Sequence, residues 1–184
     1  MIEIRIHGRG GQGAVLASII LARAAHFDGW NVQVFPEFGV ERRGAPVAAF
    51  ARLDRQPIYI RSKVYEPDHI IVFDSALMST CDLTAGLKRG GWIVLNAQGR
   101  PSISKYPNGF KVASIDATAI AARHGIGNIS SPIVNTAMVG SFAGATRLVS
   151  IEAVAAGIRE TILSAAVESN VEAAEEAYKA SIAS

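Results

Sequence analysis

The chain has 184 residues, enough for one domain with its own core, and we expect a single domain over residues 1–184. Its net charge of +2 and the lack of a basic stripe with interleaved aromatic residues argue against nucleic-acid binding. No apolar run is long enough to cross a bilayer, so we expect no membrane contact and a cytoplasmic location. The single cysteine, Cys81, excludes an internal disulfide, and also an iron–sulfur cluster or a cysteine-only zinc site held by this chain alone.

A glycine-rich turn follows the first expected strand, over residues 1–6, and leads at once into a helix-periodic segment over 13–27. This is the layout of a phosphate-binding strand–turn–helix. Glycines leave backbone N–H groups open to an anion, and the helix N-terminus adds a favourable partial charge. We expect a phosphate-bearing ligand here, with a dinucleotide, a packing role or a partner contact as the alternatives. The candidate residues are Gly8, Arg9, Gly10, Gly11, Gln12 and Gly13.

The second expected strand, over 31–35, leads into a charged loop over 36–46. In this loop Glu41, Arg42 and Arg43 form a dense charged group, and arginine forks bind phosphate or carboxylate through two parallel hydrogen bonds. In a parallel sheet the loop opens on the same edge as the glycine turn. The alternative is a solvated charged loop, or ion pairs across a subunit contact.

Glu37 bears on whether the ligand is NAD. A Rossmann site for a nicotinamide cofactor needs an acidic residue at the end of the second strand to hold the ribose. Glu37 is near that place, but a long charged loop begins there. An NAD-binding protein is therefore an outside alternative.

The remaining elements are a mixture of strands and helices. Residues 47–53 and 56–60 suggest an antiparallel hairpin that turns at Asp54 and Arg55. Asp74 and Ser75 follow the apolar strand 70–73, at the end where open α/β sheets bind ligands. Further strands are expected over 92–96 and 112–116, and helices over 81–87, 117–124, 133–146, 150–163 and, at the C-terminus, about 165–184. We predict an α/β fold: a Rossmann-like, mostly parallel sheet with helices on both faces and an antiparallel hairpin addition.

Asn135 and Thr136 fall in the first turn of the helix that Pro132 is expected to start. Such residues can face an active site, or they can cap and pack a helix in the ordinary way. The sequence has no serine nucleophile motif, and its four histidines lack metal-ligand spacing. We therefore predict no catalytic or metal-binding residue. His7, directly before the glycine turn, is the one histidine placed near a candidate site.

Three motifs, in this order, resemble the gamma subunit of the 2-oxoacid:acceptor (ferredoxin) oxidoreductases, the pyruvate/ketoisovalerate family. The first is the glycine turn, Gly8 to Gly13. The second is Phe35-Pro36-Glu37-Phe38-Gly39-Val40-Glu41-Arg42-Arg43-Gly44-Ala45-Pro46-Val47, and the third is Ser131-Pro132-Ile133-Val134-Asn135-Thr136-Ala137-Met138-Val139-Gly140. The resemblance extends to about Ile162. Val40 is a minor departure, because many relatives have proline there.

The resemblance implies a division of labour among subunits. These enzymes decarboxylate a 2-oxoacid on thiamine diphosphate with Mg²⁺, pass electrons through [4Fe-4S] clusters to ferredoxin or another acceptor, and transfer the acyl group to coenzyme A. The resemblance places thiamine diphosphate, Mg²⁺ and the clusters on partner alpha, beta and ferredoxin-like delta subunits, and none on this chain. The glycine turn, Glu41, Arg42, Arg43, Asn135 and Thr136 would then contact coenzyme A in a shared site.

Two functions of different classes follow from this resemblance. The chain is either a coenzyme A-handling subunit or a purely structural scaffold with no ligand. Its apolar fraction of 49 % predicts a buried subunit interface in both cases. The 2-oxoacid is not specified by the sequence and could be pyruvate, a branched-chain 2-oxoacid, 2-oxoglutarate or an aryl substrate such as phenylglyoxylate.

Overall fold

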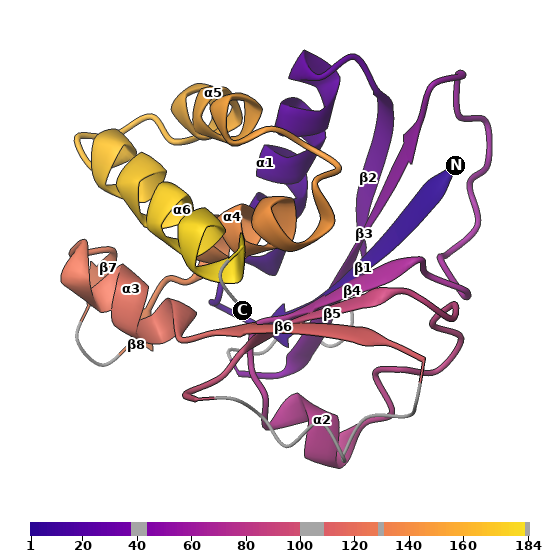
Figure 1. The fold of residues 1–184 in the computed structure, drawn as a ribbon, viewed down its shortest axis with the longest axis horizontal. Coiled ribbons are helices and arrows are strands. Elements are labelled where there is room, and N and C mark those ends of the chain that lie inside the picture. Colours follow the sequence, from indigo (N-terminus) through magenta and orange to yellow (C-terminus); the bar gives the residue numbers. More distant parts are fainter. Residues whose placement is uncertain (38–43, 100–108, 129–130, 183–184) are drawn as a thin grey trace.

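A computed structural model describes residues 1–37, 44–99, 109–128 and 131–182 of the chain. A six-stranded sheet in the order β2-β3-β1-β4-β5-β6 forms its centre (Figure 1). The strands are β1 (Ile2–Arg9), β2 (Asn31–Glu37), β3 (Pro46–Asp54), β4 (His69–Val72), β5 (Trp92–Asn96) and β6 (Lys111–Ile115). The pairs β1·β4, β4·β5 and β5·β6 are parallel, which confirms a mostly parallel α/β sheet.

Strand β3 supplies the antiparallel part of the sheet, but not in the predicted hairpin. It pairs with β1 on one side and with β2 on the other, so the expected pairing of 47–53 with 56–60 is wrong. Both edges of β3 are already occupied, which leaves no hydrogen-bonding edge for residues 56–60. Since β3 is antiparallel to both neighbours, β1 and β2 run in the same direction and end at the same edge of the sheet.

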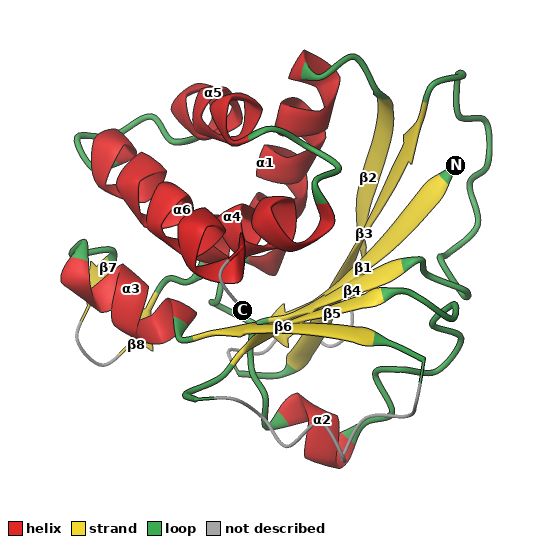
Figure 2. Cartoon of the chain, viewed as in Figure 1, coloured by secondary structure: helices red, strands yellow, loops and turns green. Residues whose placement is uncertain are grey.

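Four helices cover one face of this sheet, as Figure 2 shows: α1 (Ala14–Phe27), α4 (Asn135–Thr146), α5 (Ile151–Thr161) and α6 (Val167–Ile182). Ile4 and Ile6 of β1 point into this layer and are fully buried with Phe142 of α4. Helices α4 and α6 pack closely at Gly140. A Cβ atom added there would lie only 2.1 Å from the carbonyl oxygen of Ala174. This face forms the main apolar core.

The other face has a smaller cover. The one-turn helix α2 (Leu77–Thr80) and the turns after it bury Leu77, Leu83 and Leu87 against β4 and β5. The helix predicted over 81–87 is wrong, because Asp82 accepts hydrogen bonds from the amide and hydroxyl of Thr84 and so stabilises a turn. Helix α3 (Ala117–Arg123) follows β6 but packs with α4 and α6 on the first face, where Ala117, Ile120 and Ala121 join the main core. Helices thus lie on both faces, as predicted, but very unequally (Figure 1).

Helix boundaries near the C-terminus also differ from the expected ones. Ser131–Pro132 forms the short strand β8, which pairs with β7 (Gly127–Asn128), so Pro132 lies outside α4. Helix α5 ends at Thr161, before the expected residue 163. Helix α6 begins at Val167, after the expected start near residue 165. In the part of the chain that the structure describes, no helix is both long and apolar enough to cross a membrane.

Candidate functional site

The glycine loop and the loop after β2 meet at one edge of the sheet. His7 of β1 and Glu37 of β2 both pair with Ala48 of β3. The strands β1 and β2 therefore end at the same level, on either side of β3. Gly10 N donates to the carbonyl of Ala45 over 2.9 Å, and Gly44 N donates to the carbonyl of Gly10 over 3.1 Å. The predicted convergence of the two loops is therefore confirmed for their described residues.

The glycine loop is tightly folded, and several of its own amides are already bonded. Gln12 Oε1 accepts from the amide of Arg9 at 2.7 Å, and the Gln12 amide donates to the Arg9 carbonyl at 3.0 Å. The expectation that the whole loop offers open amides is thus only partly met. The amides of Gly11, Gly13 and Ala14 donate to no described residue, and they lie at the N-terminus of α1, where an anion is favoured.

Glycine is required at two points of this loop, and at Gly13 for two reasons. Gly11 and Gly13 have φ angles of 94° and 82°, in the left-handed region that other residues rarely adopt. In addition, a Cβ atom on Gly13 would lie 2.9 Å from Nδ2 of Asn135. The loop is therefore shaped by its backbone, and it packs directly on the start of α4.

Arg9 fixes the loop to the next strand instead of facing solvent freely. Its Nε donates to Oδ2 of Asp74 over 2.5 Å, and its Nη1 donates to the carbonyl of Gly44 over 3.1 Å. One side chain thus joins the glycine loop, Gly44 just before β3 and the carboxyl end of β4. Because Asp74 largely neutralises the guanidinium charge, the main role of Arg9 is to hold the glycine loop against β4, as a brace between the two.

A polar pocket of about 370 Å³ lies beside the glycine loop. Helix α1 follows β1 on one face of the sheet and α2 follows β4 on the other, so the pocket occupies the switch point where open α/β sheets bind ligands (Figure 1). Asp74 and Ser75, expected here from the sequence, line it. Its other polar lining residues are Gln12, Asn96, Gln98, Asp116 and Thr118.

The carboxylates of this pocket are occupied by short-range hydrogen bonds. Asp74 Oδ1 accepts from the amide of Ala76 at 2.9 Å, and Asp116 Oδ1 accepts from the amide of Ala119 at 2.8 Å as the cap of α3. Asn96 donates to the hydroxyl of Thr118 and to the carbonyl of Phe73. The pocket can therefore bind polar groups of a ligand. Its described side chains do not include a nucleophile hydrogen-bonded to a base. Among the described residues no group of three or more His, Cys, Asp or Glu side chains could hold a metal ion.

The other predicted site residues fall in different places. Asn135 and Thr136 are buried, and Thr136 donates to Oδ1 of Asn170 on α6 over 3.0 Å. Asn135 borders the glycine loop and Thr136 belongs to the helix packing. Glu41, Arg42 and Arg43 lie outside the described residues.

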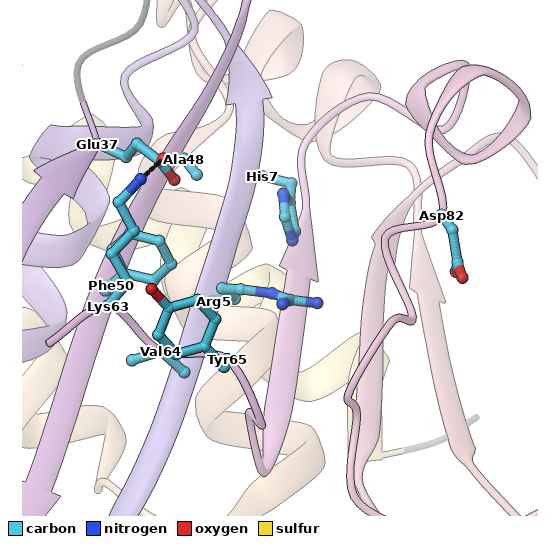
Figure 3. A pocket seen from close by; sticks show the side chains of 9 residues that line it. All are labelled: Arg5, His7, Glu37, Ala48, Phe50, Lys63, Val64, Tyr65 and Asp82. Atoms are coloured by element: carbon cyan, nitrogen blue, oxygen red, sulfur yellow. Dashed lines mark hydrogen bonds and ion pairs between the residues drawn. The ribbon is translucent and has the colours of Figure 1, made fainter.

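Glu37 lies on the opposite face from the main helices. It pairs with Lys63 and lines a second pocket with Arg5 and His7 (Figure 3). Strand β3 also separates β2 from β1, whereas the ribose-binding acid of a dinucleotide site belongs to a strand next to the glycine-loop strand. The NAD alternative therefore loses the residue on which it depended.

The brace from Arg9 to Asp74 and the roles of Asn96, Asp116 and Thr118 were missed from the sequence. Asn96 and Asp116 each come at the carboxyl end of a strand, which is a recognisable signal. The pairing of Arg9 with Asp74 joins residues far apart in the sequence, and it becomes visible only when β1 and β4 are placed together.

Comparisons with known proteins support one family. A family described as pyruvate ferredoxin/flavodoxin oxidoreductase matches residues 3–180. The chain is 49 % identical to the pyruvate/ketoisovalerate oxidoreductases common subunit gamma of Thermococcus kodakarensis, over 99 % of this chain and 98 % of the relative. It is 51 % identical to the pyruvate synthase subunit PorC of Methanocaldococcus jannaschii, over 97 % of this chain and 96 % of the relative.

Solved structures agree with the family at the level of the fold. The pyruvate oxidoreductase subunit PORC of Thermotoga maritima has a TM-score of 0.82 and 34 % identity, over 97 % of this chain and 95 % of that one. A 2-oxoglutarate:ferredoxin oxidoreductase of Magnetococcus marinus has a TM-score of 0.80 at 18 % identity, and its matching region is 31 % of that chain. The protein belongs to the gamma-subunit branch of the pyruvate ferredoxin/flavodoxin oxidoreductase family.

Proposed function

We propose that this gamma subunit helps bind coenzyme A in an oxidoreductase that converts a 2-oxoacid to acyl-CoA and CO₂, and that it also holds the catalytic subunits together. The observation that carries the proposal is the pair of loops joined at the N-terminus of α1. There the amides of Gly11, Gly13 and Ala14 are available to an anion, and the sequence adds Arg42 and Arg43 to the second loop.

The fold relatives support coenzyme A as the ligand. The Magnetococcus enzyme is described with 2-oxoglutarate, coenzyme A and succinyl-CoA bound. Coenzyme A carries phosphates that suit backbone amides and arginine forks. The names of the gamma-type relatives favour pyruvate or a branched-chain 2-oxoacid as the substrate of the complex.

The redox chemistry is assigned to partner subunits. Thiamine diphosphate with Mg²⁺ would supply decarboxylation, and [4Fe-4S] clusters would carry electrons to ferredoxin or another acceptor. One cysteine cannot ligate such a cluster, so alpha, beta and ferredoxin-like delta subunits are proposed to hold these groups. The complex is proposed to work in the cytoplasm.

The first test changes Arg43 in the assembled enzyme. Removing one charge-assisted hydrogen bond costs about 1.5–3 kcal/mol, so Arg43→Ala should raise the KM for coenzyme A about tenfold to a hundredfold. The KM for the 2-oxoacid should stay unchanged, because decarboxylation takes place on another subunit. Arg23→Ala, on the exposed side of α1, is the matched control and should leave both KM values at the parent level.

A second pair of variants separates backbone strain from ligand binding. Gly11→Ala and Gly90→Ala both place alanine at positive φ, 94° and 81°, but Gly90 lies in the turn before β5, away from the loop. Only Gly11→Ala should raise the KM for coenzyme A. If Arg43→Ala and Gly11→Ala both assemble and keep the parent value, the ligand-free scaffold is the better account.

We also propose that the chain is inactive alone. Purified chain supplied with thiamine diphosphate, coenzyme A and a 2-oxoacid should not reduce a dye acceptor, whereas the complete complex should. Turnover by the isolated chain would show that the division of labour is wrong.

A further inference from the structure

A second pocket, of about 290 Å³, opens on the sheet face opposite the main helices. Arg5 and His7 of β1 form its centre, with Phe50 of β3, Glu37 of β2 and Tyr65 around them (Figure 3). Ligand pockets are usually about 300–1,000 Å³, so this pocket is at the lower limit for a small molecule. Its size suits a single side chain presented by another protein.

Arg5 is a half-buried cation to which no carboxylate of the described residues is hydrogen-bonded. Its Nη2 donates to the carbonyls of Leu83 and Ala85 over 2.9 and 2.7 Å, which are neutral groups. Its Nε is buried and has no partner among the described residues. Burial lowers the pKa of Arg5, as expected for a charge removed from water without full compensation. Such cations are normally paired when they are buried.

The nearby carboxylates do not fill this role. Glu37 is held in an ion pair by Lys63, and Asp82 Oδ1 accepts from the amide and hydroxyl of Thr84. Neither bonds to the guanidinium of Arg5. Asp82 and Glu37 act on the Arg5 charge only through space, so within the described residues its guanidinium has no hydrogen-bonded carboxylate.

His7 adds a second unsatisfied nitrogen beside Arg5. Its Nε2 is buried and has no partner in the described part of the chain. Burial and the Arg5 charge lower the pKa of His7 to about 4, so the ring is neutral near pH 7 and its Nε2 is free to carry the single proton. Arg5 Nε and His7 Nε2 are thus two buried nitrogens of the same strand that have no partner among the described residues.

The segment that contributes Lys63, Val64 and Tyr65 to the pocket carries exposed side chains and is held in place. Residues 57–66, which we name the strap, carry Tyr59, Ile60 and Tyr65 with exposed fractions of 85 %, 45 % and 70 %. The buried Arg52 binds the strap through the carbonyls of Ile60, Ser62 and Lys63. These exposed side chains are therefore presented on an anchored segment.

We propose that this pocket docks another subunit of the same oxidoreductase, which inserts a carboxylate side chain between Arg5 and His7 and covers the strap. The carboxylate supplies the missing partner of Arg5, while Tyr59 and Tyr65 lose their exposed surface. Tyr and Arg are the residues that most often dominate the centre of a protein interface. This inference rests on the proposed function, because it requires the complex to which a gamma subunit belongs.

Crosslinking in the assembled enzyme tests the proposal. With Tyr65 replaced by p-benzoylphenylalanine, irradiation should link this chain to a partner-subunit peptide that contains Asp or Glu. Leu163, exposed at 91 % in the turn between α5 and α6, is the matched control and should not link to that peptide. No intersubunit product from Tyr65, or a product only with a second copy of this chain, would overturn the proposal.

Binding strength gives a second readout. The double variant Tyr59→Ser/Tyr65→Ser should weaken association with the remaining subunits at least about tenfold, because truncating interface hot spots has effects of this order or larger. Leu163→Ser should leave association unchanged. Replacing the crosslinked acidic residue of the partner by its amide should weaken association to a similar extent, and unchanged affinity in both experiments would contradict the proposal.

The readouts separate this proposal from coenzyme A binding. If Tyr65 crosslinks to a partner but Arg43→Ala keeps the parent KM for coenzyme A, docking stands and the coenzyme A site fails. If Arg43→Ala raises that KM but Tyr65 forms no intersubunit link, the reverse holds.

Discussion

The two faces of the sheet are built in opposite ways. The face under α1, α4, α5 and α6 is closed by aliphatic side chains and small residues, with Ile4, Ile6 and Phe142 fully buried. On the other face, the half formed by β1, β2 and β3 carries charged side chains, and Arg5 and Arg52 hold loops to it through backbone carbonyls. The first face stabilises the fold, and the second leaves polar groups available to partners.

The largest expected effect tests the helix-covered face. Phe142→Ala removes a fully buried ring from α4 and should lower the free energy of unfolding by about 3–5 kcal/mol. Denaturant unfolding measures this directly. The same change at Phe27, exposed at 49 %, is the control and should have a much smaller effect. Equal losses at both positions would contradict a tightly packed helical layer.

Arg52 tests whether the polar face is also structural. Its side chain is 1 % exposed and binds Glu3, Gln33 and the strap carbonyls, so Arg52→Met leaves several buried acceptors unpaired. The expected loss is roughly 3–5 kcal/mol. The exposed Arg23, paired with Glu160, is the control, and Arg23→Met should change stability by about 0–1 kcal/mol. Comparable losses in the two variants would show that the strap is not anchored as described.

On the polar face, the buried His7 should make the free energy of unfolding depend on pH. Its folded pKa of about 4 lies below the usual 6.5, so between these pH values the unfolded chain binds a proton that the folded chain does not. The parent protein should therefore lose stability as pH falls from about 6.5 to 4, and it should be unaffected by this group above 6.5.

The variant His7→Gln isolates that effect. Other groups, including His69, whose pKa is also lowered by burial, titrate in both proteins and cancel in the difference. Relative to the parent, the variant should gain roughly 3 kcal/mol between pH 7 and pH 4. Unfolding curves at the two pH values measure it, and parallel losses in both proteins would rule out a buried neutral His7.

The smallest effect concerns a link within the helical layer. Ser150 accepts from the amide of Ala153 at 3.2 Å and donates to Asp28 at 2.9 Å, so it caps α5 and joins it to the end of α1. Ser150→Ala should lower stability by about 1 kcal/mol. Ser150→Thr keeps the hydroxyl and should restore most of it, which thermal unfolding can resolve.

How far the sequence predicted the molecule depends on the range of the interactions. The strands near 70–73 and 92–96 and the helix over 13–27 follow from local periodicity and turn residues. The place of β3 between β1 and β2 does not, because it depends on pairings across the chain. The helix expected over 81–87 failed because the Asp82 side chain stabilises a turn instead.

The candidate site was predictable to a similar limit. The glycine motif and the ends of parallel strands indicated the correct edge of the sheet, including Asp74 and Ser75. The sequence could not show that Arg9 bonds to Asp74, that Gln12 accepts from the Arg9 amide, or that Arg5 bonds to the carbonyls of Leu83 and Ala85. Each of these depends on side chains that meet only after folding.

Hydrogen exchange in the assembled enzyme, with and without coenzyme A, tests the central claim most directly. The account predicts that coenzyme A slows exchange in the peptide spanning Gly8 to Leu16, while the 2-oxoacid alone does not. The turn containing Gly90 should be unchanged. Slower exchange in other subunits with no change over Gly8 to Leu16 would contradict coenzyme A binding by the glycine loop.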